Sequence, residues 1–158
     1  MNREIKFRAW DKKGKRMFRV QKILFGAAGE GAFCVDGIAF NPSEIKTMNW
    51  CPENDCGQEN AQHCELMQFT GLKDKNGKDI YEGDIVKWGH HCEFCRENPI
   101  RIAEVKINPD IQFHAYNVKS RLEKPGYVIF NFGNFAYQNT DKHLEVIGNI
   151  YENPELIK

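Results

Sequence analysis

The sequence predicts a mainly β protein, with a β-hairpin N-terminal subdomain followed by an SH3-like barrel in the C-terminal part. Three observations lead to this prediction. An Asn76-Gly77 step stands between runs of β-branched and aromatic residues within residues 66–86, and such a step supplies the positive φ angles of a tight hairpin turn. Short stretches elsewhere alternate apolar and polar residues, as half-buried strands do. No stretch shows sustained helical periodicity.

The N-terminal elements are expected to be two hairpins. Residues 5–10 alternate apolar and basic side chains, which predicts a strand with one buried and one wet face. Residues 11–15 turn the chain, and residues 17–20 return as the partner strand. The Asp-Gly pair within residues 33–40 suits a two-residue turn, so a second hairpin is expected there. Residues 41–44 break the pattern and include a serine that can cap a short helical turn.

The C-terminal part is expected to form the barrel. A Glu-Gly-Asp turn at residues 82–84 enters a strand of alternating apolar residues, which is how many small SH3-like barrels begin. We place the subdomain boundary in the loop of residues 51–64, so residues 1–64 form the N-terminal β subdomain and residues 65–158 the barrel. The expected barrel strands are residues 85–88, 100–107, 111–116, 127–132 and 144–151.

The chain contains a short internal echo. Residues 11–18 align with residues 74–81, and both segments read Asp-Lys-x-Gly-Lys at their start. A duplication would produce this match. Turn chemistry also produces it, because Asp starts turns, Gly ends them and Lys keeps a loop wet. We favour the second explanation.

Composition indicates a soluble globule of one domain or two small subdomains. The 158 residues are 41% hydrophobic and 28% charged. Apolar runs are far shorter than the roughly 20 residues that cross a bilayer. The charged first residues have no apolar run behind them, so no secretory signal is expected and the cytoplasm is the predicted location. In that reducing compartment the six cysteines are thiols or metal ligands.

Charge is unevenly distributed, although the net charge is zero. Residues 1–22 hold nine basic side chains against two acidic ones, a net charge of +7, whereas residues 23–66 hold seven acidic side chains against one lysine, a net charge of −6. The two segments either fold against each other and cancel, or leave a basic face that attracts phosphate. In the second case the expected nucleic-acid contacts are in the first turn, at Lys12, Lys13, Lys15 and Arg16.

Five of the six cysteines lie in two polar loops, which suggests a zinc site. A Cys-x-x-Cys pair places two thiolates on one tetrahedral ion, and a Cys-x4-Cys pair supplies the other two. The first-choice ligands are Cys51, Cys56, Cys92 and Cys95, and the substitutes are Cys64, His63, His90 and His91. The alternative is that these are reduced thiols that pack as small side chains. A redox role for Cys92 and Cys95 would need a βαβ setting, which the sequence does not show.

Catalysis is the minority interpretation. Glu82 and Asp84 lie two apart, but they sit at a turn entering a strand, where acids are common. The sequence has no Gly-rich phosphate loop, nucleophile elbow or His-Glu-x-x-His motif. A late aromatic cluster in residues 127–137 is expected to fill the barrel core. The alternative role of this cluster is to stack on unpaired bases. The absence of any basic residue between positions 126 and 141 argues against that role, because affinity for a phosphate backbone comes mainly from Lys and Arg.

Three stretches resemble one family. Residues 3–11, residues 66–86 and residues 144–156 are similar, in this order, to the YopX family of phage and prophage proteins. The resemblance implies an all-β protein with a barrel-like C-terminal part, and it implies no activity. We therefore expect a phage- or prophage-encoded, non-enzymatic binding module whose partner is unknown. A nucleic-acid-binding module that uses the basic first hairpin and a metal-dependent hydrolase are the two alternatives.

Overall fold

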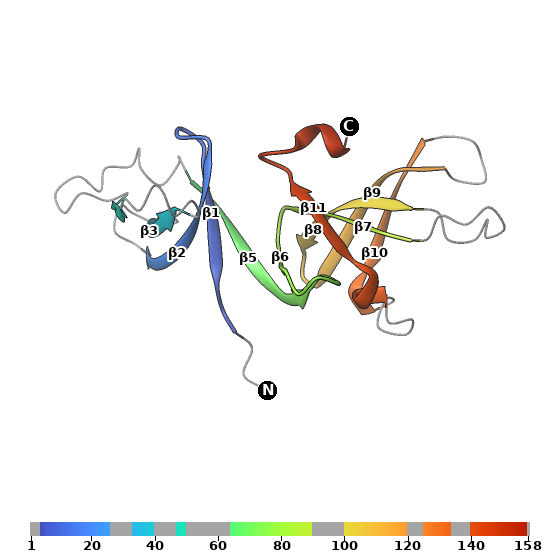
Figure 1. Cartoon of the computed structure of the whole chain (residues 1–158), viewed down its shortest axis with the longest axis horizontal. Coiled ribbons are helices and arrows are strands. Elements are labelled where there is room, and N and C mark those ends of the chain that lie inside the picture. The colour runs from blue at the N-terminus through green and yellow to red at the C-terminus, as the bar shows by residue number, and fades with distance from the viewer. Residues whose placement is uncertain are drawn as a thin grey trace. The chain divides into compact units, whose positions relative to one another are not determined.

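The protein is mainly β, and its described residues form two antiparallel sheets with almost no helix (Figure 1). The computed structural model describes residues 4–25, 33–39, 47–49, 64–89, 100–119, 125–133 and 140–157. The sheet orders are β4-β3-β2-β1-β5-β6 and β10-β9-β8-β7-β11. The elements are β1 Phe7–Asp11, β2 Arg16–Phe25, β3 Phe33–Ala39, β4 Thr47–Asn49, β5 Cys64–Lys73, β6 Asp79–Tyr81, β7 Asp84–Trp88, β8 Arg101–Ile107, β9 Ile111–Lys119, β10 Pro125–Asn131, β11 Glu145–Asn149, and the 3-10 turns η3 Thr140–His143 and η4 Pro154–Ile157.

The chain forms two compact units that divide inside β5. One unit contains Glu4–Gln68 and the other contains Phe69–Lys158. The boundary predicted from the sequence is the loop of residues 51–64, and residues 51–63 lie outside the described ranges. Because β5 pairs with β1 through Gln68 and with β6 from Phe69 onward, one continuous strand belongs to both units.

The first unit is built on the predicted β1–β2 hairpin. Ala9 is paired with Phe18 on β2 and with Leu66 on β5, so one face of three strands forms a small core around fully buried Ala9 and Phe18. The expected wet face of β1 is wrong. Arg8 is buried and donates its Nε–H to Met67 Sδ at 3.1 Å, because β1 is a central strand whose long side chains lie along their neighbours.

The second predicted hairpin is also wrong. Residues 33–39 form the single strand β3, which pairs with β2 on one side and with β4 on the other. Asp36 and Gly37 lie opposite a shift in the register of β2 between Val20 and Lys22. A bulge of this kind adds a residue to one strand and bends it, and a small residue opposite suits that bend as well as it suits a turn. The residues expected to form a helical turn, 41–44, lie outside the described ranges.

The hairpin around Asn76-Gly77 is confirmed. β5 and β6 are joined by residues 74–78, in which the N–H of Gly77 donates to the Asp74 carbonyl at 2.9 Å and Gly77 has φ of +80°. This is a turn with a left-handed residue at its end, the position where glycine carries no steric penalty. The turn is attached to the start of β11, since the N–H of Lys75 donates to the Leu144 carbonyl at 2.9 Å.

The expected later strands are present as β7 to β11, and they form a curled sheet rather than a closed barrel. β11 returns to pair with β7, while β10 and β11 are the two edges of this sheet in the described residues. Two strands, β8 and β9, separate β7 from β10, yet the rings of Trp88 and Phe130 lie only 5.5 Å apart. A flat sheet would hold those strands about 14 Å apart, so this sheet curls strongly around its core.

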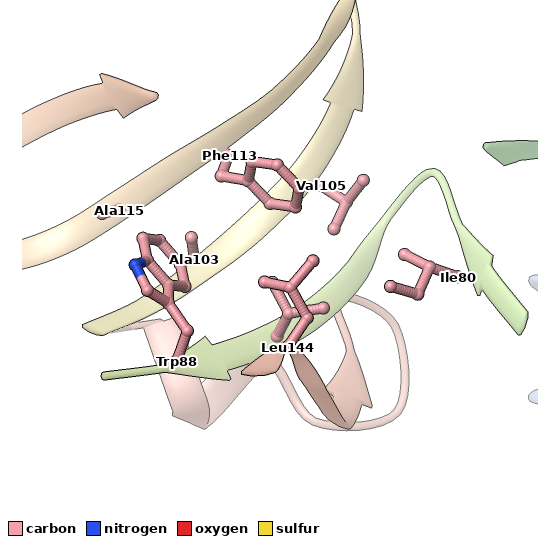
Figure 2. Close-up of a cluster of buried hydrophobic side chains, with 8 residues drawn as sticks. Ile80, Trp88, Ala103, Val105, Phe113, Ala115 and Leu144 are labelled. Carbon is pink, nitrogen blue, oxygen red and sulfur yellow. The ribbon is translucent and has the colours of Figure 1, made fainter. Parts of the chain in front are cut away.

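The core of the second unit fills the concave side of that sheet. Figure 2 shows Trp88, Ala103, Val105, Phe113 and Ala115 from three strands facing Leu144 and Ile80. Alternation explains the composition of the cluster, because successive side chains of a strand point to opposite faces. Phe130 and Phe132 pack against the core, as predicted for these two aromatic residues. Residues 134–137 of the same predicted cluster lie outside the described ranges.

Two of the three stretches that carry the family resemblance, residues 66–86 and 144–156, meet in this unit. Gly83 donates its N–H to the Val105 carbonyl at 2.8 Å and accepts the N–H of Ile150 through its own carbonyl at 2.9 Å. Asn149 Oδ1 accepts the N–H groups of Tyr151 and Glu152 at 3.0 and 2.9 Å, which turns the chain after β11. These motif residues therefore have structural roles.

Candidate functional site

The tip of the first hairpin is shaped by Asp11. Its carboxylate is fully buried, and Oδ1 accepts the N–H of Lys13 at 2.9 Å. Lys15 has φ of +52°, the left-handed conformation that closes the four-residue turn onto Arg16. A Cβ at Gly14 would collide with Asp11 Oδ2, so the absence of a side chain there makes room for the carboxylate. In this turn the aspartate is therefore buried, and the lysines are exposed to solvent.

The four predicted basic residues fall into two pairs. Lys12 forms an ion pair with Glu65, and Arg16 Nε lies 3.4 Å from Asp11 Oδ2. The side chains of Lys13 and Lys15 are exposed and make no ion pair with any described residue. Arg19 on β2 is exposed in the same way. The expected cancellation of charge between segments therefore occurs at Lys12, whereas the outermost lysines keep their charge toward solvent.

The expected zinc ligands lie outside the described residues. Residues 50–63 and 90–99 are not described, and they include all four first-choice ligands and three of the substitutes: Cys51, Cys56, Cys92, Cys95, His63, His90 and His91. Within the part of the chain that the structure describes, no three metal-ligating side chains come together. The zinc site therefore stays a prediction.

Cys64, a proposed substitute ligand, is a poor thiolate. It is buried at the start of β5, opposite Asp11. Burial and, to a smaller extent, the neighbouring Asp11 carboxylate together raise the pKa of this thiol to about 11. A zinc ligand must be a thiolate, so the surroundings of Cys64 favour the packing role instead.

The acid pair is used by the backbone. Asp84 is 1% exposed, and its Oδ2 accepts the N–H of Tyr81 at 2.8 Å. Glu82 Oε1 accepts the N–H of Ile107 at 3.5 Å. Asp84 therefore closes the turn between β6 and β7, and Glu82 joins this turn to β8; these are structural roles that acids at turns commonly have.

One feature of the aromatic cluster was missed from sequence. The guanidinium carbon of Arg101 lies 4.8 Å from the centroid of the Phe130 ring. No basic residue lies between positions 126 and 141, but β8 and β10 are separated by only one strand, β9, and the Arg101 side chain reaches across it to the Phe130 ring. The spacing of the two residues along the chain gives no signal for this contact, because it depends on the order of the strands in the sheet.

Comparison with known proteins places this all-β chain in a family. The family model described as YopX protein matches residues 6–158, so the chain belongs to the YopX family. Among solved structures it is similar to that of protein EF1440 from Enterococcus faecalis, with 28% sequence identity, a TM-score of 0.53, and coverage of 99% of this chain and 100% of that one. No curated protein matches it in sequence. Among the described residues, no helix has the length and apolar character needed to span a membrane.

Proposed function

We propose that this protein is a non-enzymatic binding module that contacts nucleic acid through the tip of the β1–β2 hairpin. The observation that supports this is the state of charge at the tip. Lys13 and Lys15 are exposed and have no ion pair with a described residue, while the nearby acid, Asp11, is buried and occupied by Arg16 and a backbone N–H. Exposed lysines on a protruding turn bind the phosphate backbone without reading sequence.

The scaffold that we propose for the second unit is a partly open SH3-like barrel. Its support is the meander from β7 to β10, the return of β11 to β7, and the curl that brings Trp88 to Phe130. The expected setting is the cytoplasm of a cell that carries phage or prophage DNA, which would give a basic hairpin its partner. In addition, zinc bound by Cys51, Cys56, Cys92 and Cys95 remains proposed from their spacing.

The nucleic-acid proposal is tested by removing only the two free charges. A Lys13→Gln, Lys15→Gln variant leaves the ion pairs of Lys12 and Arg16 in place. The matched control is Lys78→Gln with Lys142→Gln, two exposed lysines of the second unit. The measurement is affinity for a duplex and for a single-stranded oligonucleotide over a range of salt concentrations. We expect the hairpin variant to lose about tenfold in affinity at low salt and its salt slope to fall by about two, one for each lysine.

Two results would contradict the proposal. One is an equal loss of affinity in the hairpin variant and the control variant, since nonspecific charge would then explain binding. The other is binding by the natural chain that ignores salt, because contacts to phosphate release counterions and must weaken as salt rises.

The zinc proposal has a separate test. Elemental analysis of protein purified without an affinity metal should find about one zinc per chain, and Cys92→Ser or Cys95→Ser should each reduce it. Zinc content that is unchanged in both variants would return these cysteines to the class of ordinary thiols.

A further inference from the structure

We propose that Arg101 and Phe130 form a stacking platform for an unpaired base of single-stranded nucleic acid. The proposal rests on the proposed function and deepens it, because it names single strands as the preferred class of partner. It begins from a stack that is already assembled. The Arg101 guanidinium carbon is 4.8 Å from the Phe130 ring centroid, and the Trp88 ring meets the Phe130 ring edge-on at 5.5 Å with an interplanar angle of 86°.

The base of this stack is held in place by the core. Trp88 is only 8% exposed, and its ring also contacts that of fully buried Phe113, with the ring centroids 5.9 Å apart. Phe130 is half-buried and packs against the same core. Three rings from three different strands therefore fix the plane on which the guanidinium rests. A platform that is fixed before binding loses little conformational entropy when a ligand arrives.

The top of the stack remains partly open. Arg101, like Phe130, is half-buried, and it makes no ion pair with a described residue. Its guanidinium carbon lies over the Phe130 ring. In the proposed complex a base stacks on the side of the guanidinium that faces away from this ring, and a phosphate pairs with its positive charge.

The chemistry of this platform fits a nucleotide with an unpaired base. A base offers a flat π surface that stacks on a guanidinium plane. The phosphate of the same nucleotide offers a negative partner for the positive charge of Arg101. A base inside a duplex is already stacked on both faces and cannot use the platform. An acidic side chain would satisfy the charge of Arg101 but would leave the planar surface unused.

The experiment separates stacking from charge. The probes are an oligothymidylate of about 15 nucleotides and an abasic strand of the same length, which carries the same phosphates without bases. The variant is Arg101→Lys, which keeps the positive charge and removes the plane. Arg19→Lys is the matched control, because Arg19 is an exposed arginine of the first unit. Thermal melting of both variants shows whether the fold is intact.

We expect Arg101→Lys to bind oligothymidylate about tenfold more weakly, the equivalent of one stacking contact, and to bind the abasic strand as the natural protein does. Arg19→Lys should leave both affinities unchanged. Phe130→Leu, which removes the support of the guanidinium, should show the same base-dependent loss.

The outcomes also distinguish the two proposals. Equal losses for the thymidylate and abasic strands, or no loss for either, would overturn the platform and leave the hairpin proposal standing. A base-dependent loss at Arg101 with no effect of Lys13→Gln, Lys15→Gln would overturn the hairpin alone. Failure of the natural protein to bind either strand at low salt would overturn the platform, and failure to bind a duplex as well would overturn both proposals.

Discussion

Two hairpin turns of this chain share the letters Asp-Lys-x-Gly-Lys but are held by different contacts. In both, a buried aspartate accepts the N–H two residues ahead, from Lys13 to Asp11 at 2.9 Å and from Asn76 to Asp74 at 2.8 Å. Beyond this shared step, Asp11 meets the side chain of Arg16. Asp74 instead accepts further backbone N–H groups.

The second aspartate reaches beyond its own turn. Asp74 Oδ1 also accepts the N–H of Lys78 at 2.9 Å, and Oδ2 accepts the N–H of Val146 in β11 at 3.2 Å. One carboxylate thus joins the β5–β6 hairpin to the last strand of the sheet. The shared step is ordinary Asx-turn chemistry, and everything after it differs, which favours turn chemistry over duplication as the source of the echo.

The largest predicted difference is in stability. Asp74→Ala leaves three backbone N–H groups without their acceptor, so it should lower the free energy of unfolding by about 3 kcal/mol. Asp11→Ala removes one backbone acceptor and the partner of a half-exposed arginine, so it should cost about 1.5 kcal/mol. Urea unfolding gives both values, and Asp110→Ala, at an exposed aspartate, should be close to neutral. Equal losses of stability at Asp11 and Asp74 would show that the hydrogen bond from Val146 in β11 to Asp74 adds nothing to the free energy of unfolding.

The glycines sharpen the comparison. Gly14 has no room, because an added Cβ would collide with Asp11 Oδ2, whereas Gly77 has open space around it but φ of +80°. Gly14→Ala should cost about 2 kcal/mol through overpacking, and Gly77→Ala about 1 kcal/mol through backbone strain. The controls differ in kind. In an Asp11→Ala background the Gly14→Ala penalty should largely vanish, while Gly77→Asn should cost less than Gly77→Ala because Asn tolerates the left-handed region. A Gly14→Ala penalty that persists without Asp11 would refute the steric explanation.

The same two turns show how far sequence reasoning goes. Alternation and turn residues act locally, so they predict the β1–β2 and β5–β6 hairpins and the strands from β7 to β11. The turn predicted at Asp36-Gly37 is wrong because a dipeptide that suits a turn also suits the position opposite a bulge. The local sequence does not distinguish the turn from the bulge, since the bulge lies in the neighbouring strand β2.

The candidate sites show the same difference between local patterns, which the sequence reveals, and contacts between distant residues, which it does not. The basic turn of residues 12–16 is visible in the sequence, but which lysines stay free depends on Glu65, far along the chain. The contact between Arg101 and Phe130 arises from the strand order of the second sheet, which no local pattern encodes. Side chains that depend on distant partners therefore escape a reading of the sequence alone.

The smallest predicted difference appears only at the extremes of pH. Burial acts to raise the pKa of Asp74, but the N–H groups of Lys78, Val146 and Asn76 outweigh it, and the pKa lies below its usual value of 3.8. Near Asp11 the titrating group is Cys64, whose pKa is raised from 9.0 to about 11, first by burial and then by the Asp11 carboxylate. The two turns should therefore respond to opposite changes in pH.

The signs follow from linkage between protonation and folding. A carboxylate with a lowered pKa contributes stability above pH 3.8, and that contribution is lost as pH falls through the folded-state value, so Asp74→Asn should flatten the acid side of the stability curve. A thiol with a raised pKa contributes its full stability below pH 9.0 and loses it as pH rises toward 11, so Cys64→Ala should flatten the alkaline side. Urea unfolding of the natural chain and both variants across this range measures the slopes. Since Lys and Tyr also titrate above pH 9, only the difference in slope between the natural chain and Cys64→Ala reports the thiol. Parallel curves on the alkaline side would mean that Cys64 ionises as readily in the folded protein as in the unfolded chain, and its burial beside Asp11 would then have no energetic consequence.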